Sequence, residues 1–129
     1  MAAEANNHKT ILIVDDSKTI RAILKDFLKD QPYRLLEASN GVEALNEMND
    51  AAVNLVITDI MMPEMNGFKL LENIKEKHKG VDVIAMSGVG GRSTADSVLR
   101  GLNRLGVRNT LTKPFSKAEL LRLVSRVIE

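Results

Sequence analysis

The chain has 129 residues, a formal net charge of +1 and 44% hydrophobic residues, which fits one domain of ordinary size. It contains no cysteine, which excludes disulfides and thiolate metal sites and agrees with a reducing compartment. No apolar run is long enough to span a membrane, and no signal-peptide pattern opens the chain. We therefore expect a soluble, cytoplasmic protein.

Charge is unevenly distributed along the chain. Residues 1–91 carry 10 Lys and Arg against 14 Asp and Glu, whereas residues 92–129 carry 8 against 3. The basic last third is read most simply as a solvated surface, and alternatively as a docking face for an acidic partner near Arg100, Arg104 and Arg122. We do not expect a nucleic-acid partner, because aromatic residues make up only 3% of the chain and zinc-finger spacing is absent.

Strand-like and helix-like patterns alternate after a polar segment, residues 1–9, which we expect to be a flexible tail. Short apolar runs predict strands at 10–14, 33–38, 54–59, 81–87 and 107–112. Apolar residues at helical spacing predict helices at 18–29, within 39–48, from 67 to near 80, at 93–105 and from 116 onward. The alternation predicts one α/β domain over residues 10–129, with a doubly wound, five-stranded parallel sheet and five helices.

Polar side chains stand where the predicted strands end. In an open parallel sheet, ligands bind outside the carboxyl ends of the strands. Carboxylates about 4 Å apart repel by roughly 4 kcal/mol at an effective dielectric near 20, and a divalent cation such as Mg²⁺, which prefers oxygen ligands, removes this repulsion. Alternatively, the first acidic pair serves only to cap the helix at 18–29. The residues concerned are Asp15, Asp16, Asp59, Ser87, Thr112 and Lys113.

Four motifs together resemble the receiver domain of two-component response regulators. They are IVDD (13–16), VITDIMMPEMNG (56–67), IAMSG (84–88) and LTKPFS (111–116), and the resemblance spans about residues 10–128. It implies a flavodoxin-like fold with strand order 2-1-3-4-5. It also implies that Asp59 accepts a phosphoryl group from a histidine kinase or phosphotransfer protein, in a signalling domain that is not an enzyme.

The resemblance also assigns roles to the residues around Asp59. Mg²⁺ would be held by Asp15, Asp16, Asp59 and the backbone carbonyl of Met61. Lys113, with a cis bond to the following proline, would pair with a phosphate oxygen, and the hydroxyl of Ser87 would bind the phosphate as part of a switch.

The match departs from the family at three places. Thr110 stands where the family usually has Tyr or Phe, so the usual aromatic switch is not expected. The segment 88–91 is rich in glycine, which makes its ordering costly. Met61 and Val89 flank the site with apolar side chains, which predicts slow hydrolysis of the acyl phosphate.

Pro63 and Gly67, the latter able to take a positive φ, would turn the chain away from the site.

A stand-alone receiver that controls partner binding is the leading interpretation. One alternative is a receiver fragment of a longer regulator. Another is an aspartyl-phosphate phosphohydrolase, but such enzymes usually carry a second Asp two residues after the nucleophile, where this chain has Met61. The segment 88–93 matches neither the dinucleotide fingerprint nor the P-loop.

Overall fold

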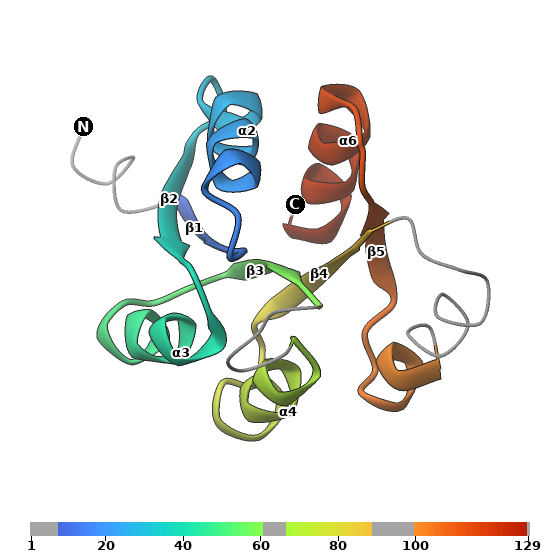
Figure 1. Ribbon diagram of the computed structural model, residues 1–129. Coiled ribbons are helices and arrows are strands. Elements are labelled where there is room, and N and C mark those ends of the chain that lie inside the picture. The colour runs from blue at the N-terminus through green and yellow to red at the C-terminus, as the bar shows by residue number, and fades with distance from the viewer. Residues whose placement is uncertain (1–7, 61–66, 89–99, 129) are drawn as a thin grey trace.

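The computed structural model describes residues 8–60, 67–88 and 100–128. These residues form a five-stranded parallel sheet in the order β2-β1-β3-β4-β5 (Figure 1). The strands are β1 (Lys9–Val14), β2 (Tyr33–Ala38), β3 (Leu55–Asp59), β4 (Asp82–Ser87) and β5 (Asn109–Thr112). The helices are α2 (Lys18–Leu28), α3 (Gly41–Asp50), α4 (Gly67–Lys77) and α6 (Lys117–Ile128), and residues 100–104 form a further helical segment. The predicted fold class and strand order are confirmed.

Helices cover both faces of the sheet. Helices α2 and α6 lie on one face, and α3, α4 and the helical segment 100–104 lie on the other (Figure 1). Because side chains alternate along a strand, Ile11 and Ile13 of β1 join the core under α2 and α6, whereas Leu12 and Val14 join the opposite core. All five residues of β3 are buried, which is typical of a central parallel strand covered on both sides.

Side-chain caps define where the helices begin. The Oγ of Ser17 accepts a hydrogen bond from the backbone N–H of Ile20 and caps α2. The alternative reading of the acidic pair as the cap of this helix is therefore wrong. Ser116 and Glu119 form the reciprocal capping box at the start of α6, with distances of 3.0 and 3.1 Å.

Gly67 marks a close contact between two backbones. The expectation that it supplies a positive φ is wrong, because among the described residues only Gly80 and Gly106 have positive φ. A Cβ at Gly67 would lie 2.5 Å from the Cα of Ile60 and 2.7 Å from the carbonyl oxygen of Asp59. The N–H of Gly67 also donates to the carbonyl of Ile60 at 2.7 Å. Glycine therefore allows α4 to begin directly against the end of β3. Pro63 lies outside the described residues.

The last strand is shorter than predicted, because it begins at Asn109 and not at residue 107. The N–H of Val107 donates to the carbonyl of Leu102 at 2.9 Å, and Gly106 has a φ of 76°. This arrangement is a Schellman-type helix end, so Val107 finishes the preceding helix. The inner strand β1 begins at Lys9, which pairs with Tyr33, one residue earlier than predicted.

Candidate functional site

Three charged residues from distant parts of the chain meet at the carboxyl edge of the sheet. Asp15 follows β1, Asp59 ends β3 and Lys113 follows β5. The Nζ of Lys113 lies 2.8 Å from Oδ2 of Asp15 and 3.4 Å from Oδ2 of Asp59. Asp15 and Lys113 are 98 positions apart in sequence, so the sheet topology brings them together.

Both acids of this group are buried. Asp15 is 0% exposed and Asp59 is 7% exposed, and a buried carboxylate is costly unless it is paired or hydrogen-bonded. The second oxygen of Asp15, Oδ1, accepts a hydrogen bond from the backbone N–H of Ser17 at 2.9 Å. Burial by itself lowers the pKa of Lys113, but the hydrogen bond and charge of Asp15, with the charge of Asp59, outweigh it and hold the pKa above its ordinary 10.5. Lys113 is therefore a protonated partner of the acids.

The acidic group has the composition of a cation site. Asp15, Asp16 and Asp59 each offer a carboxylate oxygen, and these oxygens lie within 4.8 Å of one another. One lysine against three carboxylates leaves two negative charges, which a divalent cation balances. All-oxygen donors suit Mg²⁺. Both oxygens of Asp15 already accept from protein donors, whereas Asp16 is exposed, so Asp16 is better placed than Asp15 to be a direct ligand.

Backbone hydrogen bonds hold the ends of the last strands around the site. The N–H of Ile60 donates to the carbonyl of Met86 at 3.1 Å, and the N–H of Lys113 donates to the carbonyl of Ser87 at 2.8 Å. The peptide bond between Lys113 and Pro114 is cis, as expected. Ser87 is the register partner of Thr112, so it lies at the same edge as Asp59.

The structure describes only some of the other residues that the sequence analysis named. Met61 and Val89 lie outside the described residues, so the backbone ligand and the slow hydrolysis stay predictions. Thr110 is an exposed residue of the edge strand β5. Arg104 and Arg122 are exposed; the helical segment containing Arg104 and helix α6 lie on opposite faces of the sheet, with β5 at the edge between them (Figure 1).

One residue near the site was missed from the sequence. The Nη1 of Arg21 donates to the carbonyl oxygen of Asp15 at 2.6 Å, and its Nε donates to Oε1 of Glu37 at 3.1 Å. In the sequence Arg21 is a polar position of an amphipathic helix, and neither periodicity nor motif spacing distinguishes it from other surface cations.

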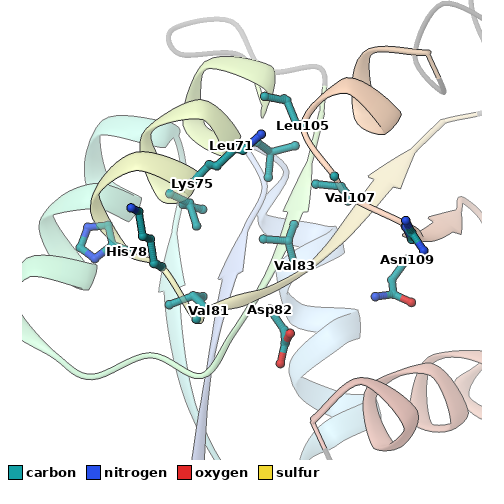
Figure 2. A pocket seen from close by; sticks show the side chains of 14 residues that line it. Leu71, Lys75, His78, Val81, Asp82, Val83, Leu105, Val107 and Asn109 are labelled. Atoms are coloured by element: carbon teal, nitrogen blue, oxygen red, sulfur yellow. The ribbon is translucent and has the colours of Figure 1, made fainter.

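A cavity of about 320 Å³ lies at the opposite edge of the sheet, at the amino-terminal ends of β4 and β5. Figure 2 shows its wall of Leu71, Val83 and Val107, with Lys75 and His78 of the α4 side at its margin. It contains none of the acidic residues brought together around Lys113. The residues at the strand ends therefore place the candidate functional site at the acidic carboxyl edge of the sheet and not in this cavity.

Fold and site together define a class of α/β protein with an acidic cation site and a lysine at the carboxyl edge of a parallel sheet. The chain belongs to the response regulator receiver domain family, which it matches over residues 11–125. Receiver domains are signalling domains that bind Mg²⁺ at an acidic pocket and interact with histidine kinases or phosphotransfer proteins. None of the helices in the described ranges is long and apolar enough to cross a membrane.

Relatives include both short and longer proteins. The chain is 36% identical to the chemotaxis protein CheY1 of Helicobacter pylori over 110 residues, covering 82% of this chain and 86% of CheY1. It is 33% identical to response regulator RR06 of Streptococcus pneumoniae over 118 residues, covering 92% of this chain and 52% of RR06. The chain thus spans about half the length of that regulator. The signal receiver domain of an HD domain-containing protein from Pseudomonas fluorescens superposes with a TM-score of 0.85 at 26% identity, covering 94% of each chain.

Proposed function

We propose that Asp59 accepts a phosphoryl group from a phosphohistidine of a sensor kinase or phosphotransfer protein, with Mg²⁺ bound, and that phosphorylation controls the binding of a partner. The observation that carries this proposal is the position of Lys113, whose ammonium contacts both Asp15 and Asp59 at the ligand-binding edge of the sheet. A phosphoryl group on Asp59 would therefore lie beside the ammonium of Lys113.

The transfer requires a nucleophile, charge neutralisation and positioning. A carboxylate oxygen of Asp59 forms a bond to phosphorus while the bond from phosphorus to the histidine nitrogen breaks, and the electron pair leaves with the nitrogen. Bound Mg²⁺ supplies electrostatic stabilisation of the transferring group, whose loose transition state depends mainly on charge and alignment. Asp16 and Asp59 would be direct ligands of the ion, with Asp15 beside them, and the backbone carbonyl of Met61 would complete the set.

Lys113 and Ser87 then stabilise the product. The ammonium of Lys113 lies closer to Asp15 than to Asp59, and its flexible stem allows it to pair with a new phosphate oxygen. The hydroxyl of Ser87, at the same strand edge, donates to another phosphate oxygen. These two contacts would draw the segment after β4 toward Asp59 and change the surface that partners meet.

The output partner docks near Arg100, Arg104 and Arg122 through an acidic segment. The last third of the chain holds the excess of basic residues. Arg104 and Arg122 are exposed, and the helical segment containing Arg104 and helix α6, which contains Arg122, lie on opposite faces of the sheet near the edge strand β5 (Figure 1). We assign this signalling to the cytoplasm, in a receiver domain of residues 10–129 that either acts alone or forms part of a longer regulator.

Incubation with acetyl phosphate and Mg²⁺ tests the reaction. Intact mass measurement should detect one phosphoryl group per chain in the wild type and none in Asp59→Asn, which keeps the shape of the side chain without its nucleophilic carboxylate. Omission of Mg²⁺ should also abolish the adduct. Many turnovers of acetyl phosphate without a stoichiometric adduct would instead favour a phosphohydrolase.

A further inference from the structure

Arg21 connects the acidic edge with the neighbouring strand. Its side chain is mostly buried, with 15% exposed. One nitrogen donates to the carbonyl oxygen of Asp15 at 2.6 Å, and another donates to the carboxylate of Glu37 at 3.1 Å. Hydrogen bonds from a charged donor are shorter and stronger than neutral ones, and the 2.6 Å contact belongs to that class.

The carbonyl that Arg21 holds belongs to the peptide between Asp15 and Asp16. A peptide unit is planar, so fixing its oxygen also fixes the amide nitrogen from which Asp16 extends. Asp15 is held at its other polar atoms as well, since its N–H donates to the carbonyl of Ala38 at 3.2 Å and its carboxylate is bound by Ser17 and Lys113. The hydrogen bond from Arg21 to the carbonyl of Asp15 completes this set of contacts, at the peptide bond that leads to the exposed Asp16.

Glu37, whose side chain is 37% exposed, pairs with Arg21 from the neighbouring strand. Glu37 belongs to β2 and is the register partner of Ile13, two residues before Asp15. Its other oxygen accepts from Lys25 at 2.8 Å. Hydrogen bonds therefore run from Glu37 of β2 through Arg21 to the carbonyl of Asp15. They link the paired strands β1 and β2 next to the acidic residues.

We propose that Arg21 is a positioning residue for the Mg²⁺ site, acting through the peptide between Asp15 and Asp16, with Glu37 orienting its guanidinium. This role rests on the proposed function, because it presumes that the acidic edge binds Mg²⁺. Partners that orient metal ligands from outside the coordination sphere alter metal affinity by about 10- to 100-fold when they are removed. Arg21 acts on the backbone beside a ligand, so we expect an effect near 10-fold.

The charge of Arg21 and its hydrogen bond to Asp15 predict opposite effects of Arg21→Gln on the affinity for Mg²⁺. Removing a cation that contacts the backbone of Asp15, near the acidic edge, would by electrostatics alone tighten Mg²⁺ binding. Loss of the hydrogen bond to Asp15 would instead weaken it. Arg21→Lys keeps the charge, but its single ammonium lacks the planar fork that serves both Asp15 and Glu37, so it isolates the geometric contribution.

The experiment is calorimetric titration of the folded proteins with MgCl₂. We expect dissociation constants about 10-fold higher for Arg21→Gln and Arg21→Lys, a smaller increase for Glu37→Gln, and no change for Lys25→Gln, which contacts Glu37 but not Asp15. The rate of phosphorylation by acetyl phosphate should fall in the Arg21 variants at limiting Mg²⁺ and recover at saturating Mg²⁺.

The outcomes separate the two proposals. Wild-type affinity in both Arg21 variants, or tighter binding in Arg21→Gln with no change in Arg21→Lys, would overturn the positioning role and leave the Mg²⁺ site intact. Absence of Mg²⁺ binding in the wild type would overturn the proposed function as well. Chemical denaturation without Mg²⁺ serves as the control for folding, since a merely structural role would lower stability without changing the affinity of the folded protein.

Discussion

Gly67→Ala tests the contact between the start of α4 and the phosphoacceptor strand. The added methyl would lie 2.5 Å from the Cα of Ile60 and 2.7 Å from the carbonyl oxygen of Asp59. Both are backbone atoms, so no side-chain rotation relieves the overlap and one segment must move. Overpacking of this kind costs about 1–3 kcal/mol, whereas alanine in a helix gains up to about 1 kcal/mol over glycine. We expect a net loss of about 1 kcal/mol in the free energy of unfolding.

Urea denaturation followed by circular dichroism measures this loss. For a urea dependence of about 2 kcal/mol per molar, the midpoint should fall by about 0.5 M. Gly88→Ala is the matched control, because no atom of the described residues lies within 4 Å of its added Cβ and its φ is not positive; its midpoint should stay the same or rise. Phosphorylation of Gly67→Ala should also slow, because a displacement of about 1 Å at a reacting group can cost on the order of 100-fold. A midpoint at or above that of the wild type would refute the argument from close contact.

Three further predictions concern charge, capping and metal. Hydrogen bonds from Lys25 and Arg21 lower the pKa of Glu37 below its ordinary 4.5 against the opposing effect of burial; its stabilisation is therefore present above pH 4.5 and lost as the pH falls through the lowered value. Stability below pH 4.5 should accordingly fall more steeply in the wild type than in Glu37→Gln; parallel acid titrations of stability would contradict this. Ser116→Ala removes an N-cap and should lower the free energy of unfolding by about 1 kcal/mol, measured by thermal unfolding, whereas an unchanged melting temperature would show that the cap contributes nothing. Mg²⁺ at 100 times its dissociation constant should stabilise the wild type by about 2.7 kcal/mol, and Asp59→Asn should gain less in the same thermal assay; equal gains would exclude Asp59 as a ligand.

Local signals in the sequence identify most of the secondary structure. The apolar runs that end in Val14 and Asp59 are strands as predicted, and the pair Ser116 and Glu119 forms the predicted capping box. These features depend on neighbours within about four positions, so periodicity and residue type are sufficient. The expectation that strand-end residues share one edge also follows from the sequence, because the βα alternation requires parallel strands.

Contacts between segments were decided only by the tertiary structure. The alternation does not set the distance from Lys113 to Asp15 and Asp59, which depends on the register of four strands, β1, β3, β4 and β5. Nor does it reveal why residue 67 is glycine, or that Arg21 reaches back to the carbonyl of Asp15. Such contacts join atoms whose approach is set by packed strands and helices, and no residue type within one segment encodes its distance from another. The sequence by itself determined which groups reach the carboxyl edge; the packed fold determined which of them touch.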